Sequence, residues 1–104
     1  MAVLKAFADV LQELRTKKKT GALYILVAEA SENLVRFYFK EGEICSLSYG
    51  PIKDRECLDI LDCYTLGKAV YFDGMKAPME SANLPKTDVI IAMVKRKGTQ
   101  IQTD

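Results

Sequence analysis

The sequence predicts a single α+β domain, in which an antiparallel sheet of about four strands packs against three helices in the order α-β-β-β-α-β-α. The length of 104 residues is typical of one domain, and a hydrophobic content of 49% is enough to build one core. Apolar residues recur at helical spacing in some segments and at strand spacing in others. We therefore interpret residues 1–104 as one domain, without a linker or an internal repeat.

The clearest strand pair is predicted between Leu34 and Gly50. Two runs rich in aromatic and β-branched residues flank the short segment Glu41-Gly42-Glu43. Gly42 can adopt the positive φ that tight hairpin connections require. A hairpin this apolar needs a cover, which the predicted helices can supply.

The N-terminal half of the chain is predicted to form one helix and a three-stranded meander. Residues 3 to about 18 form an amphipathic helix, because Val3, Phe7, Val10 and Leu14 recur at three- and four-residue intervals. Thr20-Gly21 then ends the helix and turns the chain. The three strands of the meander are expected at residues 22–28, 34–40 and 44–49.

The C-terminal half is predicted to add two helices and one strand. Asp54 is placed to cap a helix whose apolar face is Cys57, Ile60, Leu61 and Tyr64. The helix is followed by a strand at 69–73, a long surface loop at 74–86, a helix at 89–97 and a polar tail at 98–104. We expect the tail to fray, so that the folded core covers about residues 3–97.

Composition excludes several classes of function. The 15 basic and 14 acidic residues leave a net charge of +1, so no global field attracts nucleic acid or anionic lipid. The longest apolar runs are about six residues, against the roughly 20 that span a bilayer, and charge interrupts the start before a signal-peptide core can form. The three cysteines are odd in number, which favours reduced thiols and a cytoplasmic protein.

No set of residues predicts catalysis, a metal site or a cofactor. The chain has no histidine, which excludes Ser-His and Cys-His nucleophile pairs and Cys/His zinc sites within one chain. Cys57 and Cys63, six residues apart on one helix, point in directions that make them poor joint ligands for a metal. All three cysteines, including Cys45, are interpreted as buried structural thiols. Glu41 and Glu43 are expected to be solvated at the hairpin tip. We expect the protein not to be an enzyme.

Apolar surface is the feature that predicts binding to another protein. If alternate residues of the meander face the helices, then Tyr24, Leu26 and Tyr38 lie together on the opposite face of the sheet. The last helix is apolar almost all round, so it is either central or shared with a partner. The candidate interface residues are Tyr24, Leu26, Tyr38, Ile90, Met93 and Val94. The sequence leaves open whether a helix or the 74–86 loop covers the tyrosine face.

Nucleic-acid binding is the alternative function. It requires two basic helix ends to converge in space, and the candidate contacts are Lys17, Lys18, Lys19, Lys95, Arg96 and Lys97. Cations at the C-terminus of a helix also complement its macrodipole, and no aromatic residues are interleaved for stacking on bases. The sequence therefore favours solvated helix ends over nucleic-acid contacts, and we expect neither a nucleic acid nor a membrane as partner.

A series of short motifs resembles one protein family. Thr20-Gly21 precedes the first strand, Gly42-Glu43-Ile44 forms a Gly-x-Ile hairpin tip, and a small residue follows two positions later. Further along the chain, the matching features are Gly50, Cys57-Leu58, Gly67 and Tyr71-Phe72. The order of these motifs over about residues 3–97 resembles the DUF4388 or PATAN family. Asp54 and Ala69 depart from the family's pattern, which often has a glycine and a larger aromatic residue there.

The resemblance implies a bacterial, noncatalytic interaction module. Members of the family occur alone or beside response-regulator receiver domains, and in systems with small GTPases of polarity or motility. The family supplies no catalytic residues. Together with the apolar surface, it predicts a signalling adaptor that works by protein binding and by self-association as a homo-oligomer.

Overall fold

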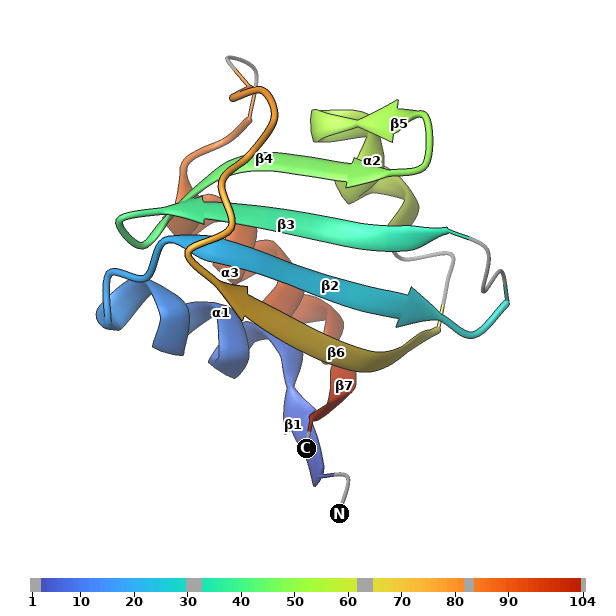
Figure 1. Cartoon of the computed structure of the whole chain (residues 1–104). Coiled ribbons are helices and arrows are strands. Elements are labelled where there is room, and N and C mark those ends of the chain that lie inside the picture. The colour runs from blue at the N-terminus through green and yellow to red at the C-terminus, as the bar shows by residue number, and fades with distance from the viewer. Residues whose placement is uncertain (1–2, 30–32, 62–64, 82–83, 104) are drawn as a thin grey trace.

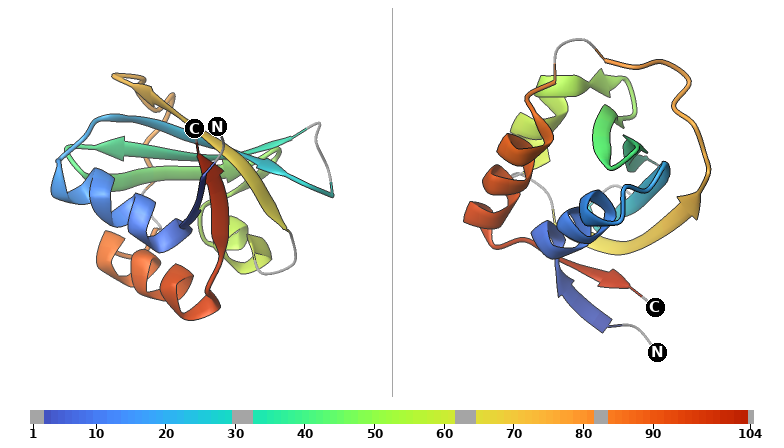
Figure 2. Two further views of the ribbon diagram at one scale, coloured as in Figure 1. Left: turned by 90° about the horizontal axis from the view of Figure 1, so that it is seen from below. Right: turned by 90° about the vertical axis from the view of Figure 1, so that its left-hand side faces the viewer.

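A seven-stranded mixed sheet is the frame of the described chain, with three helices packed on one of its faces (Figures 1 and 2). The computed structural model describes residues 3–29, 33–61, 65–81 and 84–103. The strands are β1 Val3–Ala6, β2 Gly21–Val27, β3 Leu34–Lys40, β4 Glu43–Tyr49, β5 Ile52–Lys53, β6 Leu66–Asp73 and β7 Gln100–Thr103. The helices are α1 Phe7–Thr16, α2 Asp54–Ile60 and α3 Thr87–Lys97.

The predicted meander is confirmed at the centre of the sheet. Strand β2 pairs antiparallel with β3, and β3 pairs antiparallel with β4 across the hairpin tip at Glu41-Gly42. Gly42 has a φ of +88°, as expected for this tip. Strand β6 lies on the other side of β2 and is also antiparallel to it. The alternation of apolar residues therefore predicts the central strands correctly.

The expectation of about four antiparallel strands is wrong. The strand order in the described residues is β1-β7-β6-β2-β3-β4-β5, and β6 and β7 form a parallel pair through Lys68 and Gln102. Both ends of the chain account for most of the difference. Residues 3–6, which were expected to begin a helix, pair with residues 100–103, which were expected to fray. Each segment supplies the other's backbone hydrogen-bonding partners, and this long-range pairing overrides the local helical pattern.

The three helices occur as predicted but with different bounds. Helix α1 begins at Phe7 rather than at residue 3 and ends at Thr16, while α3 begins two residues before Val89. Ile60 is the last residue of α2, and its predicted continuation to Tyr64 lies outside the described residues. None of the helices in the described ranges has the length and apolarity needed to cross a membrane.

Helices α1 and α3 pack against each other in opposite directions. Arg15, near the end of α1, forms an ion pair with Asp88 at the start of α3. At the other end, the backbone N–H of Phe7 donates to the carbonyl of Thr99, which follows α3, at 2.9 Å. The C-terminal end of each helix therefore lies near the N-terminal end of the other, as the view from below also shows (Figure 2).

The core lies between the sheet and the helices. Phe7 of α1 meets Phe37 of β3 edge to face, with the ring centroids 5.3 Å apart. Ile101 of β7 is fully buried, so the polar tail expected at 98–104 contributes to the core. The largest fully buried side chains are Phe7, Phe37, Phe39, Leu11, Ile25, Leu47, Leu58, Ile90 and Ile101.

The hairpin tip is fastened to the turn between α1 and β2. The N–H of Gly42 donates to the carbonyl of Lys19 at 2.8 Å, and the N–H of Glu41 donates to the hydroxyl of Thr20 at 2.9 Å. A Cβ on Gly42 would lie 2.7 Å from the carbonyl oxygen of Arg15. The tip is thus a packing element against α1, and only glycine fits this close approach.

Candidate protein-binding surfaces

The outer face of the sheet, which is the face away from the helices, carries a cluster of large apolar side chains. Tyr24 of β2 stands between Val70 of β6 and Arg36 of β3, and Ala22 stands between Phe72 and Tyr38. The exposed fractions are 40% for Leu26, 43% for Val70 and 40% for Phe72, whereas Tyr24 is half-buried. We define Tyr24, Leu26, Val70 and Phe72 as the outer patch.

Tyr24 organises the outer patch through contacts on several sides. Its ring meets Phe72 edge to face at 5.1 Å, and the Arg36 guanidinium lies 5.3 Å from its ring centroid. Its hydroxyl lies 3.0 Å from the hydroxyl of Tyr38 and donates to the sulfur of Met75 at 3.1 Å. These contacts hold the aromatic side chains in fixed positions, so the patch is ordered before any partner arrives.

The loop after β6 covers part of the outer face. It crosses the face on the side opposite the helices, over one end of β2, β3 and β4 (Figures 1 and 2). The N–H of Ser81 donates to the carbonyl of Cys45 at 2.8 Å, and Lys40 forms an ion pair with Glu80 at 3.3 Å. Tyr38 is consequently only 7% exposed. Its burial, together with the hydrogen bond that its hydroxyl donates to the Tyr24 hydroxyl, raises the pKa of Tyr38 to about 12.

The loop therefore covers only part of the sheet face on which the sequence predicts the tyrosines. It covers Tyr38, which is removed from any accessible interface, but leaves Leu26, Val70 and Phe72 exposed. Tyr24 and Leu26 lie on this face as predicted from the sequence, whereas Val70 and Phe72 are additional residues that were not predicted. The alternation of Val70 and Phe72 with Ala69 and Tyr71 was the available signal. What the pattern lacked was the position of β6 beside β2, which brings the two pairs together.

The candidate interface on α3 requires a correction. Ile90 and Val94 are buried in the core of the chain, at 0% and 4% exposure, and Met93 is partly buried against it. Ile90 and Val94 are therefore not available to a partner while the domain is folded, whereas part of Met93 remains accessible. Val89 is the large apolar side chain of this helix that is exposed in the described residues, at 47%.

The two basic helix ends do not converge. Lys17, Lys18 and Lys19 follow the end of α1, which lies beside the start of α3. Lys95, Arg96 and Lys97 occupy the last turn of α3, so the 11 residues of that helix, about 16 Å of helix axis, separate the two groups. Nucleic-acid binding as predicted needs both groups on one basic surface, and the two groups do not form one.

The described thiols and carboxylates form no recognisable reactive site. Burial raises the pKa of the Cys57 thiol to about 12, and it also raises the pKa of Cys45, which is half-buried. Cys63 lies outside the described residues. Glu41 and Glu43 are exposed at the hairpin tip. In the described ranges, no three His, Cys, Asp or Glu residues are grouped so as to hold a metal ion.

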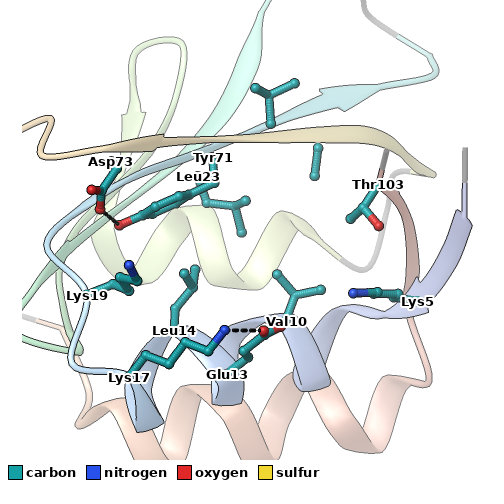
Figure 3. A pocket seen from close by; sticks show the side chains of 12 residues that line it. Lys5, Val10, Glu13, Leu14, Lys17, Lys19, Leu23, Tyr71, Asp73 and Thr103 are labelled. Atoms are coloured by element: carbon teal, nitrogen blue, oxygen red, sulfur yellow. Dashed lines mark hydrogen bonds and ion pairs between the residues drawn. The ribbon is translucent and has the colours of Figure 1, made fainter. Parts of the chain in front are cut away.

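A cavity of about 530 Å³ lies between α1 and β6, on the helix side of the sheet (Figure 3). Its apolar lining includes Val10 and Leu14 of α1, with Leu23 and Ala69 of the sheet. Tyr71 of β6 also lines it, and the Tyr71 hydroxyl donates to the carboxylate of Asp73 at 3.1 Å. The charged residues around it are Lys5, Glu13, Lys17, Lys19 and Asp73. The cavity depends on how α1 and β6 meet, so no local pattern in the sequence predicts it.

Comparison with known proteins assigns no family to the chain. Neither family models, nor curated proteins, nor solved structures matched the chain. The outer patch and the cavity are therefore interpreted from their own chemistry.

Proposed function

We propose that this protein is a noncatalytic, cytoplasmic interaction module that associates with a second copy of itself through the outer patch. The observation that carries the proposal is the exposure of Leu26, Val70 and Phe72 on adjoining strands of one sheet face. Apolar groups gathered in this way lose contact with water when a complementary surface covers them. The fixed aromatic contacts of Tyr24 reduce the ordering that binding would require.

The size of the patch indicates a weak complex. The patch spans two strands about 4.8 Å apart, over about five residues of 3.4 Å each, which gives an apolar centre on the order of 160 Å². A standard interface buries about 800 Å² per partner, so the surrounding surface must contribute as well. Met75 and Met79 of the loop, 37% and 74% exposed, extend the apolar surface from Tyr24 toward the loop. Methionine adapts its shape to a partner, which suits this peripheral position.

Charge supports a second copy as the occupant. With a net charge of +1, two copies repel each other little, and proteins near zero net charge tend to associate. The resemblance to the DUF4388/PATAN family adds a bacterial signalling context, in which the module acts as an adaptor. Within that context, we propose that further partners belong to response-regulator or small-GTPase systems.

Light scattering coupled to a sizing column tests the proposal. We expect the average mass to rise from that of a monomer toward that of a dimer as the loaded concentration rises from about 10 μM to about 1 mM. The variant Leu26→Gln with Phe72→Gln should remain monomeric over this range. The matched control is Val89→Gln, which removes a similarly exposed apolar side chain from α3 and should behave like the wild type. A wild-type protein that stays monomeric throughout contradicts the proposal.

A further inference from the structure

Half of β6 presents an open edge to solvent. In the described residues, β7 pairs with β6 at Lys68 and no strand pairs with the edge beyond it, from Val70 to Asp73. The register with β2 shows which backbone groups face that edge. Gly74 donates its N–H to the carbonyl of Thr20 at 2.8 Å, and Gly21 is opposite Asp73.

Hydrogen-bonded pairs alternate with non-hydrogen-bonded pairs along antiparallel strands. Because Gly74 bonds to β2, the N–H and C=O groups of Phe72 and Val70 also point to β2. Those of Tyr71 and Asp73 therefore point away from β2, to the open edge. Such an edge is a template for another extended chain.

The cavity beside α1 lies directly beneath this edge. Tyr71 and Asp73 belong both to the open edge and to the lining of the cavity, and Val10 and Leu14 form its opposite wall (Figure 3). In a strand added to β6, every second side chain would point to the helix side of the sheet. Those side chains would enter the cavity, whose volume of about 530 Å³ accommodates several aliphatic groups.

The charge around the cavity is net positive, with three lysines against Glu13 and Asp73, and this favours acidic residues in a partner. Lys17 and Lys19 lie at one end and Lys5 at the other (Figure 3). Lys17 is paired with Glu13 at 2.8 Å, whereas Lys5 and Lys19 form no ion pair with the carboxylates of the described residues. The hydrogen bond from Lys17 lowers the pKa of the Glu13 carboxyl, and Lys5 is near enough to lower it further, but Lys5 and Glu13 form no ion pair. A partner segment with carboxylates at both ends would add an ion pair to each of the two lysines.

We propose that the open edge of β6 binds an extended segment of another protein as an added strand, with aliphatic side chains in the cavity and acidic residues beside Lys5 and Lys19. The inference rests on the proposed protein-binding function, but it uses the edge and the helix side of the sheet rather than the outer patch. Backbone hydrogen bonds to Tyr71 and Asp73 hold the segment, and the alternation of its side chains determines specificity.

A capped synthetic peptide tests this inference. The probe has Asp-Glu at its start, Val-Thr-Val-Thr-Val in the middle and Glu-Asp at its end, with a fluorophore for anisotropy measurements against the full chain. We expect it to bind, and a peptide with lysine at the acidic positions to bind at least about tenfold more weakly. N-methylation of one alternate set of central amides should abolish binding, whereas methylation of the other set should not. Binding that survives methylation of the first set and also survives methylation of the second set would overturn strand addition.

Variants of the protein separate this site from the outer patch. Lys5→Glu with Lys19→Glu should weaken binding of the acidic peptide about tenfold or more. The control, Lys86→Glu with Lys95→Glu, makes the same charge change away from the cavity and should alter binding less than about twofold. Leu26→Gln with Phe72→Gln should keep peptide binding while losing self-association. No binding of the acidic peptide at about 1 mM, or equal binding by both charge-reversal variants, contradicts the inference.

Discussion

Replacing Gly42 with alanine should destabilise the domain far more than the same change at Gly74. Both glycines have a positive φ, +88° at Gly42 and +79° at Gly74. Their surroundings differ. A Cβ on Gly42 would lie 2.7 Å from the carbonyl oxygen of Arg15 and 3.0 Å from the Cα of Lys18, whereas a Cβ on Gly74 would meet nothing within 4 Å. The pair therefore separates backbone strain from the cost of pushing the hairpin tip away from α1.

The expected magnitudes follow from these two contributions. Backbone strain at a left-handed position costs about 1–2 kcal/mol for alanine. The lower entropy of the unfolded chain offsets about 0.4–1 kcal/mol of it. Gly74→Ala should therefore lower the free energy of unfolding by about 1 kcal/mol or less. At Gly42 the backbone atoms of α1 cannot rotate away, so overpacking adds about 1–3 kcal/mol and the total is roughly 2–4 kcal/mol.

Thermal unfolding followed by circular dichroism measures the difference. In a domain of this size, about 1 kcal/mol shifts Tm by about 4–8 °C, so Gly42→Ala should melt on the order of 10 °C below Gly74→Ala. Urea unfolding should rank the two variants in the same order. Equal losses at both positions would refute the reasoning, because they would mean that the hairpin tip does not pack against α1.

Three further predictions concern buried polar groups. Thr87→Val should lower the free energy of unfolding by about 1–3 kcal/mol in urea titrations. The reason is that the N–H of Ile44 donates to the buried Thr87 hydroxyl at 3.0 Å and would lose its partner. Thr87→Ser keeps the hydroxyl and should retain most of the stability. The Cys57 thiol should resist iodoacetamide in the folded protein at about pH 8 and react after unfolding in urea, as judged by peptide mass spectrometry, since burial raises its pKa to about 12. Equal labelling before and after unfolding would contradict its burial. Stability should also fall at alkaline pH, because folding raises the pKa values of Cys57 and Tyr38 to about 12. The contribution of these two groups to the free energy of unfolding is complete at a pH below their ordinary pKa values. It is lost as the pH rises toward about 12. A urea midpoint that is unchanged between about pH 8 and about pH 10.5 would be inconsistent with this sign.

The central strands and helices were predictable because their signals are local. Strands β2, β3 and β4 show alternation over several residues, and the Gly42 tip joins two of them. The helix at Thr87–Lys97 has a dense apolar pattern and a basic last turn. In each case a property of consecutive residues determines the local backbone.

The ends of the chain were not predictable in this way. Strand β7 has a single buried apolar residue, Ile101, between polar neighbours, which is too short a pattern to distinguish from a tail. Residues 3–6 continue the apolar spacing of α1, yet Leu4 is 62% exposed and pairs with Gln102. Strands β1 and β7 become recognisable only because they pair with each other in the folded structure.

The candidate surfaces also depend on long-range arrangement. Tyr24 and Leu26 were placed on the correct face by alternation, but the loop that buries Tyr38 carries no periodic pattern. Ile90 and Val94 looked available because a helix that is apolar all round has no obvious inner face. Its antiparallel packing on α1 decides which residues are buried, and the same packing separates the two basic helix ends.

Intermolecular nuclear Overhauser effects test self-association through the outer patch most directly. The sample would mix isotope-labelled and unlabelled chains at a concentration where the average mass indicates dimers. We expect intermolecular contacts from the methyl groups of Leu26 and Val70 to the ring protons of Phe72. Contacts confined to Val89 and the rest of α3, or the absence of any at Leu26 and Val70, would contradict the proposed interface.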